Sequence, residues 1–210
     1  MREIKNFQDF TETLGQENID LITQDFKDGF ADSIKLINYG NQLGVPVDYE
    51  MRTKCSLAHD HIKAKLRERF KDTNNSIVEM NKWNGVFALK FGDNYLCRIK
   101  KFLKGGEVSA ILTNQQQKFN GQQIITGFPD RPTFITIGYY ANLAWTEIVG
   151  VYAACWSANG LEWFNKLGGE GFLQLSIQFP QTTLPKTGSS RVKAKPGKRK
   201  DQGKTGTDNI

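Results

Sequence analysis

The sequence predicts an α+β domain in which N-terminal helices pack on one face of a mainly antiparallel, meandering β-sheet. Over roughly the first 70 residues apolar side chains recur every three or four positions, and the period then changes to two. Helices that precede a run of strands are typical of α+β proteins. From residue 180 onward aromatic residues are absent and Gly, Pro, Lys, Ser and Thr dominate, which is typical of disorder. We therefore expect one domain over residues 1–180, helical to about residue 72 and sheet from about residue 76, and a disordered basic tail over residues 181–210.

Two helices are predicted ahead of the sheet. The first covers residues 17–39, where apolar side chains share one face and Asp residues occupy the others. The second covers residues 48–70, and its expected core side consists of Met51, Cys55, Ala58, Ile62, Leu66 and Phe70. A separate polar stripe follows this second helix at spacings of three and four: Arg52, Ser56, His59, Lys63 and Arg67.

A hairpin and several later strands make up the predicted sheet. Residues 85–91 and 95–102 alternate around the turn Gly92-Asp93-Asn94. The second hairpin strand has Tyr95, Cys97 and Ile99 on one face, which leaves Arg98 and Lys100 on the other. A short helix or a loop is expected at 113–123, and further strands are expected at 133–141, 147–156, 161–167 and 171–179.

Charges are segregated along the chain. The whole chain has a net charge of +6, and residues 186–210 alone carry +6. Residues 1–50 carry −6, residues 51–104 carry +8 and residues 105–185 carry −2. A basic segment inside a neutral body, together with a basic tail, is typical of proteins that bind phosphate backbones.

We therefore predict that the basic segment binds nucleic acid. If the second helix packs beside the hairpin, their basic side chains form one positive patch, to which the tail adds sequence-independent attraction. The candidate residues are Arg52, Lys63, Arg67, Arg98, Lys100, Lys101, Lys193, Lys195, Lys198, Arg199 and Lys200. The alternative is that the basic segment only neutralises the acidic first helix, and that the tail only aids solubility.

His59 is the one candidate catalytic residue. It lies on the basic stripe, where it could act as a general acid or base beside a phosphate, as in metal-independent nucleases. His59 and His61 are the two histidines of the chain, and on a helix they point roughly 200° apart, so they cannot share a metal. Neither a Cys-x-x-Cys pair nor the Asp/Glu-x-Lys tripeptide of a restriction-nuclease core occurs in the sheet region. No metal site and no cofactor is predicted.

A protein-interaction module without a nucleic-acid role is the other main hypothesis. Aromatic residues are dense between residues 139 and 164, and any that face outward would form a contact surface. Trp145, in an expected turn between strands, is predicted to be the most exposed of them. The acidic first helix could also dock onto a partner.

Several blocks of the sequence resemble an uncharacterised bacterial family. The blocks are His59-Asp60-His61 with Arg69-Phe70, Leu96 to Phe102, Gln115-Gln116-Gln117 with Phe119 and Gln122, Gly127-Phe128-Pro129, and Gly138-Tyr139. The resemblance implies a small protein encoded beside XRE-type helix-turn-helix regulators in toxin–antitoxin or phage-defence loci. Such a regulator is then a possible protein partner. The family implies no activity for any residue.

No membrane role is expected. No apolar run approaches the roughly 20 residues that cross a bilayer, and the first ten residues lack the features of a signal peptide. We expect a cytoplasmic protein whose cysteines Cys55, Cys97 and Cys155 are reduced core residues.

Overall fold

The computed structural model describes residues 4–44, 47–71, 77–80, 86–108, 113–128 and 132–168. The helices are α1 (Phe7–Leu14), α2 (Gln16–Gln42), α3 (Met51–Phe70) and α4 (Asn114–Asn120), with a short 3-10 helix η2 (Lys104–Gly106). The strands are β1 (Ile77–Met80), β2 (Val86–Phe91), β3 (Tyr95–Lys101), β4 (Thr133–Ala141), β5 (Ile148–Ser157) and β6 (Gly160–Leu167). The strand predicted at 171–179 and the basic tail lie outside the described residues.

The strands form one sheet in chain order, β1-β2-β3-β4-β5-β6. Every neighbouring pair is antiparallel except β3 and β4, which pair in parallel from Tyr95↔Thr133 to Lys101↔Tyr139. The α+β class and the mainly antiparallel sheet are confirmed. The meander is interrupted at one place, because parallel neighbours need a crossover connection, and here that connection contains α4.

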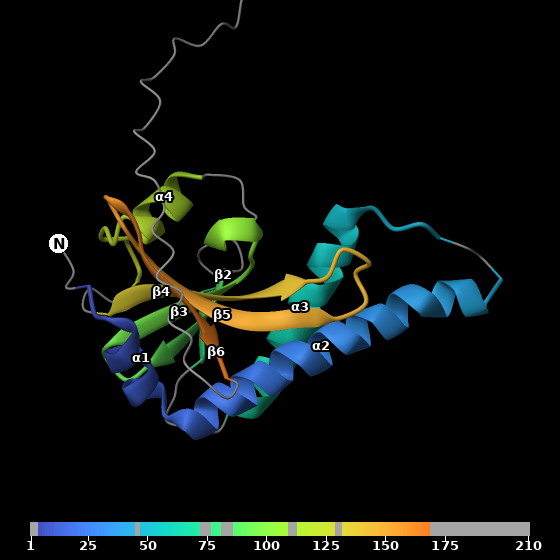
Figure 1. The fold of residues 1–210 in the computed structure, drawn as a ribbon, viewed down its shortest axis with the longest axis horizontal. Helices are drawn as coiled ribbons and strands as arrows, with labels where there is room; N and C mark the ends of the chain where they lie inside the picture. Colours follow the sequence, from blue (N-terminus) through green and yellow to red (C-terminus); the bar gives the residue numbers. More distant parts are fainter. Residues whose placement is uncertain are drawn as a thin grey trace, which may run out of the picture. The chain divides into compact units, whose positions relative to one another are not determined.

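Helices cover both faces of the sheet (Figure 1). On the α2/α3 face, side chains such as Phe26, Phe30 and Ile62 pack with Cys97 and Ile137 of the central strands. A smaller cluster lies on the α4 face and consists of Ala88, Leu96, Phe119, Ile125, Phe128 and Phe134. Successive residues of β3 therefore enter two different cores.

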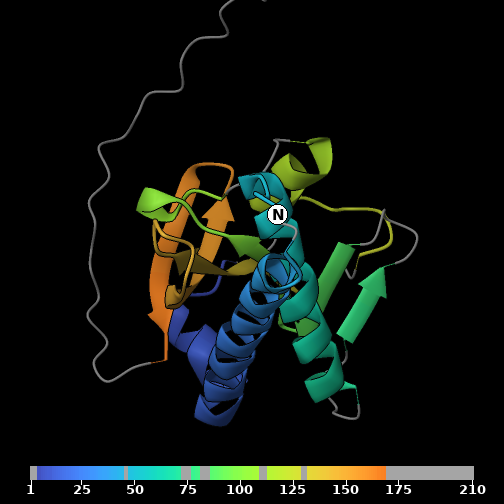
Figure 2. The ribbon, with the colours of Figure 1, turned by 90° about the vertical axis from the view of Figure 1, so that its right-hand side faces the viewer.

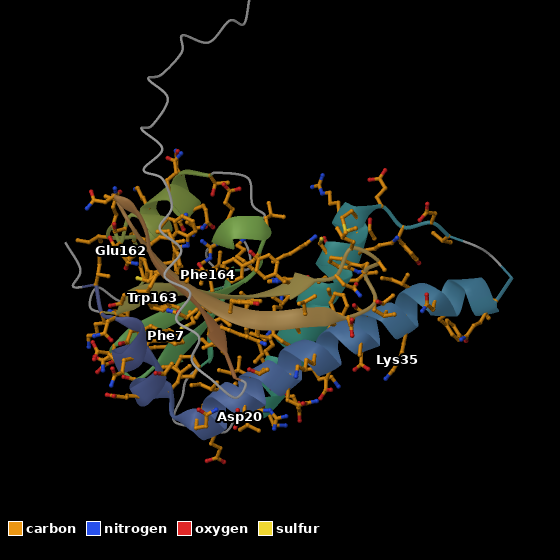
Figure 3. All side chains as sticks on the ribbon, in the orientation of Figure 1. Phe7, Asp20, Lys35, Glu162, Trp163 and Phe164 are labelled. Carbon is orange, nitrogen blue, oxygen red and sulfur yellow. The ribbon has the colours of Figure 1, made fainter. Side chains whose placement is uncertain are left out.

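Helix α1 was not predicted. The N-terminal segment that contains it packs against β6, at the edge of the sheet. Asn6 caps the helix by accepting from the Asp9 backbone N–H at 2.8 Å. The Trp163 indole N–H donates to the Lys5 carbonyl at 3.0 Å, and the rings of Phe7 and Trp163 meet at 5.3 Å (Figure 3). Its apolar residues Phe7, Phe10 and Leu14 do have helical spacing, but the helix is only 8 residues long, so the pattern has a single repeat.

Trp145 was predicted to be exposed, and the structure shows the opposite. Only 6% of its surface is exposed, and its ring lies 5.1 Å from that of Phe30 on the α2/α3 face. The residue has a positive φ of 56°, which turns the chain so that the ring points back onto the core instead of outward. The Trp145 ring is therefore not available as a contact surface for a partner.

Helices α2 and α3 lie side by side, and a glycine permits their close approach (Figure 2). A Cβ at Gly29 would lie 2.6 Å from the Ile62 Cα and 2.7 Å from the Ile62 nitrogen. Beside this contact, Arg69 donates to both carboxylate oxygens of the buried Asp25 at 2.7 Å. Lys65 pairs with Asp32 at 2.9 Å.

We predict that Gly29→Ala destabilises the protein. Alanine is favoured over glycine in a helix interior by about 1 kcal/mol, so helix propensity alone predicts a gain. The new methyl group would meet backbone atoms of Ile62, which cannot move without separating the helices, and overpacking of this kind costs about 1–3 kcal/mol. Urea denaturation should give a lower midpoint with an unchanged slope. A raised midpoint would contradict this account of the helix contact.

Candidate anion-binding site

Strands β2 and β3 separate from each other at Arg98. Their pairing runs from Phe91↔Tyr95 to Ala88↔Arg98 and ends there. Strand β2 extends back to Val86, where it pairs with β1, whereas β3 continues to Lys101 along β4. Beyond Arg98, β3 is thus no longer paired with β2 on that side.

Arg98 is the most deeply buried cation of this region. It lies on the α4 face, is 8% exposed, and its guanidinium carbon is 4.9 Å from the centre of the Phe119 ring. Its Nη1 atom is buried without a hydrogen-bond partner. Thr136, its register partner on β4, has a buried hydroxyl that also has no partner. Burial lowers the pKa of the guanidinium to about 10.

Lys100 follows Arg98 on the same face of β3. Its register partner is Gly138, where a Cβ would lie 2.7 Å from the Phe102 ring, so the missing side chain makes room for that ring. Lys100 is itself partly buried. Burial and the neighbouring charge of Arg98 lower the pKa of the Lys100 ammonium to about 8.

Helix α3 carries His59 and Lys63, and His59 is electrostatically coupled to the cations of β3. The two residues are one turn apart and partly buried. Burial lowers the pKa of His59, and so do the charges of Lys100, Lys63 and Arg98, while the adjacent Asp60 acts in the opposite direction. The charges of Lys63 on α3 and of Lys100 and Arg98 on β3 thus all act on the pKa of His59. We call His59, Lys63, Arg98 and Lys100 the cation cluster.

The structure does not bring the other predicted basic residues into this cluster. Arg52 is exposed at the start of α3, and the Arg67 guanidinium lies over the Phe87 ring at 5.5 Å. Lys101 points to the opposite face of β3, where it donates to the Cys55 sulfur at 3.6 Å and lies 4.5 Å above the Trp145 ring. The candidates in the tail, Lys193, Lys195, Lys198, Arg199 and Lys200, lie outside the described residues.

Helix α4 covers Arg98 with the Phe119 ring, a contact that the sequence did not predict. The Thr113 hydroxyl caps the helix by accepting from the Gln116 backbone N–H at 3.2 Å, and Gln116 and Phe119 form the buried side. Next to the helix, the Gln122 side chain donates to the carbonyls of Phe134 and Trp156 at 2.8 and 2.9 Å. It also accepts from the Phe134 N–H at 2.8 Å. The amide of Gln122 thus holds the crossover against β4 and β5, which keeps Phe119 over Arg98.

In the described part of the chain, Asp60 is the one acidic residue paired with the cation cluster. Among the described residues no carboxylate forms a hydrogen bond or an ion pair with Arg98 or Lys100, and Lys63 has only Asp60 at 4.0 Å. In the tripeptide Arg98-Ile99-Lys100, the basic residue Arg98 stands at the position where the nuclease pattern Asp/Glu-x-Lys has an acidic residue. Buried charges are normally paired, because desolvation penalises an isolated ion heavily. The arrangement therefore suits an anionic ligand better than a metal ion.

Within the described ranges, no group of three His, Cys, Asp or Glu side chains could hold a metal ion. The described helices include none that is both long and apolar enough to span a membrane. Comparisons with protein-family models, with curated proteins and with solved structures found no match for the chain.

We predict that Arg98→Met stabilises the protein. Methionine has a similar length and can pack on Phe119, while the cost of an unpaired buried charge disappears. Allowing for the lost cation–π contact, the free energy of unfolding should rise by about 1–2 kcal/mol in urea denaturation. Lys101→Met, on the opposite face of the same strand, is the matched control and should give no gain. If Arg98→Met were instead strongly destabilised, we would conclude that Arg98 stabilises the fold.

We also predict that His59 makes the protein less stable as the pH falls from 7.5 to 5.5. Its pKa is lowered in the folded state, so the unfolded chain binds a proton first as the pH passes through about 6.5. Stability is then lost progressively below that pH. Denaturation midpoints across this range should fall less steeply in His59→Gln than in the unmodified protein. An equal fall in both proteins would contradict the inward position of His59.

Proposed function

We propose that the folded domain binds phosphate groups of a nucleic acid through the cation cluster. The observation that carries this proposal is Arg98, a guanidinium 8% exposed with no acidic partner among the described residues. Phosphate oxygens would accept its hydrogen bonds and balance its charge, and Arg–phosphate pairs are among the stronger hydrogen bonds of proteins. Lys100, Lys63 and His59 supply further donors from two different elements.

The pairing of the other cations supports this proposal over simple charge neutralisation. Two acidic residues of α2 are paired with the basic segment: Asp32 with Lys65 at 2.9 Å and Asp25 with Arg69 at 2.7 Å. Asp32 also pairs with Lys35 of α2 itself at 3.0 Å. Lys65 and Arg69 thus have the neutralising role that the sequence allowed for the basic segment. The cation cluster is not neutralised in the same way, because Asp60 at 4.0 Å from Lys63 is its one acidic contact in the described part of the chain.

The genetic setting implied by the resemblance remains part of the proposal. A nucleic-acid-binding protein encoded beside a helix-turn-helix regulator in a toxin–antitoxin or phage-defence locus could act on the same nucleic acid as that regulator. The cation cluster supports the phosphate contact alone, and the locus and the regulator are carried by the sequence resemblance.

A protein partner is the second candidate function. Large apolar side chains are exposed near the end of α2 and the start of α3: Leu36, Tyr39, Leu43, Val47 and Met51. Exposed apolar groups that gather on one region of a protein often mark an interaction surface. Absence of nucleic-acid binding would favour the hypothesis of a protein partner.

We predict that full-length protein binds short DNA or RNA with an affinity that falls steeply with salt. Fluorescence anisotropy at several salt concentrations measures both quantities. Arg98→Met and Lys100→Met should each weaken binding about tenfold, and each should reduce the salt slope by about 0.7–0.9 for every phosphate contact that is lost. A denaturing gel of the same mixtures reports any cleavage, which His59→Gln should abolish if His59 is catalytic.

Two controls separate the cluster from general electrostatic attraction. Lys35→Met removes one positive charge from the exposed side of α2, where Lys35 is labelled in Figure 3, and should leave affinity nearly unchanged. A second variant replaces Lys193, Lys195, Lys198, Arg199 and Lys200 with Gln and should retain the effect of Arg98→Met. If neutralising the tail abolished all binding, the proposed site on the folded domain would be wrong.

A further inference from the structure

We infer that Cys55 and Lys101 form a site of oxidative modification, at which a peroxide converts the Cys55 thiol to a sulfenic acid that then condenses with the Lys101 amine. Sulfenic acids condense with thiols or with nitrogen groups, and the product here is a sulfur–nitrogen bond, a sulfenamide, between α3 and β3. The inference does not depend on the proposed function. It follows from the distance between the two side chains, from the exposure of Cys55 and from the surroundings of the Lys101 amine.

The two reactive atoms are in contact in the folded protein. The Lys101 Nζ donates to the Cys55 Sγ at 3.6 Å, and it lies 3.9 Å from the Sδ of Met51, one turn earlier on α3. Cys55 and Lys101 are 46 positions apart in the chain, so the packing of α3 on β3 brings them together. A bond between them therefore requires only a small approach of two side chains that already touch.

Cys55 differs from the other two cysteines in its exposure. It is partly exposed, whereas Cys97 and Cys155 are fully buried. Burial raises the pKa of the Cys155 thiol to about 12 and also raises the pKa of Cys97. Reactive cysteines lie in partly exposed, electropositive surroundings, and enclosed thiols are inert. Cys55 beside the Lys101 ammonium has both features of a reactive thiol.

The Lys101 amine lies beside the sulfur without a competing carboxylate. It is 4.5 Å from the centre of the buried Trp145 ring, which forms one wall of its surroundings. Within the ranges that the structure describes, no acidic side chain forms an ion pair with Lys101. A paired carboxylate would hold both the position and the proton of the amine. Without one, the sulfur of Cys55 is the group that the amine contacts.

The modification consists of two steps. In the first, the Cys55 sulfur attacks hydrogen peroxide: a sulfur–oxygen bond forms, the oxygen–oxygen bond breaks, and the sulfur gives two electrons to the peroxide. The thiol proton leaves with the released hydroxide as water. In the second step the Lys101 ammonium loses one proton to solvent and its nitrogen attacks the sulfenic sulfur. The sulfur–nitrogen bond forms, the sulfur–oxygen bond breaks, and the departing hydroxide takes a second amine proton as water.

The bond would join α3 covalently to the sheet. A covalent link that closes a loop stabilises a protein chiefly because it restricts the unfolded chain. The oxidised protein should therefore be more stable than the reduced protein. A thiol reductant should cleave the bond and restore both side chains, so the change is reversible.

The experiment treats reduced full-length protein with a small excess of hydrogen peroxide, followed by intact-mass analysis and tryptic peptide mapping. The sulfenamide lacks two hydrogens, so the mass should fall by about 2 Da. Trypsin cleaves after Lys and Arg but not after the modified Lys101, so residues 55–63 should be recovered joined to residues 101–104. The midpoint of urea denaturation should rise. Dithiothreitol should reverse all three changes.

A disulfide would lower the mass by the same amount, and the peptide map distinguishes the two products. Cys97 and Cys155 both pair with Ile135, from opposite sides of β4, so they are about 9–10 Å apart across the sheet. A disulfide needs Cα atoms within about 7 Å, so these two cysteines do not form one. A disulfide between the Cys55 residues of two copies would appear as a dimer on a non-reducing gel and would overturn the inference.

Lys101→Arg is the test variant, because arginine keeps a positive charge beside the thiol while its guanidinium stays protonated and does not attack the sulfur. Cys55 of this variant should instead be oxidised to the sulfinic acid, with a gain of about 32 Da and no joined peptides. Lys54→Met is the matched control. Lys54 is adjacent to Cys55 in sequence but pairs with Asp48 at 3.6 Å, so this variant should form the bond as the unmodified protein does.

Two results of the peptide map would overturn the inference. One is a gain of oxygen at Cys55 of the unmodified protein, with residues 55–63 and 101–104 recovered as separate peptides. The other is a cross-link to Cys55 that persists in Lys101→Arg, because a different amine would then be the partner. The first result needs no variant, so the inference can be tested even if a substitution at Lys101 lowers stability.

Discussion

The parallel pairing of β3 with β4 is the constraint on which the rest of the structure depends. Two parallel neighbours cannot be joined by a tight turn, so the chain must cross over one face of the sheet. The crossover carries α4, and α4 covers the face opposite to α2 and α3. Both faces of β3 are consequently buried, and polar residues that would face solvent in an open antiparallel sheet become interior residues.

This burial gives Arg98 and Lys100 an unusual energetic position. Each retains a positive charge in surroundings that lower its pKa, and the described residues supply no carboxylate to offset the cost. Marginally stable proteins rarely keep such charges without a use, because most unpaired buried ions can be replaced by apolar residues with a gain in stability. The proposed anion would offset this cost, since a ligand that binds the folded state alone stabilises that state.

Much of the fold could be predicted from periodicity, and the site could be predicted in part. The spacing of Phe26 and Phe30 in α2, and of Ile62 and Leu66 in α3, follows directly from one buried face on each helix. Alternation likewise separated Arg98 and Lys100 from Cys97 and Ile99 on β3. Alternation cannot show whether the polar face of a strand is exposed or covered by a helix. That depends here on the parallel pairing of β3 with β4, and the sequence of a single strand does not reveal the direction in which it pairs.

The wrong prediction for Lys101 and the missed contact of Phe119 have one physical cause, which is that both depend on tertiary structure. Lys101 was grouped with Arg98 and Lys100 because it is adjacent and basic, yet a strand sends adjacent side chains to opposite faces, and Lys101 meets Cys55 and Trp145 there. Phe119 was an apolar residue in an amide-rich stretch, with no local sign that it would lie over a guanidinium 21 positions earlier. Such contacts depend on tertiary structure, which local patterns do not encode.

Helix α3 finally explains why some basic residues are structural and others are available for a ligand. Lys65 and Arg69 are one turn apart, and they meet Asp32 and Asp25 of α2. His59 and Lys63 form a second one-turn pair, which an α-helix places on a different side from the first. The helix thus carries one stripe that is paired with acids of α2 and a second stripe whose His59 is electrostatically coupled to the cations of β3. Asp32 and Asp25 of α2 are engaged by the first stripe. Among the described residues Asp60 is the one acidic contact of the second stripe, and for that reason we propose an anionic ligand as its partner.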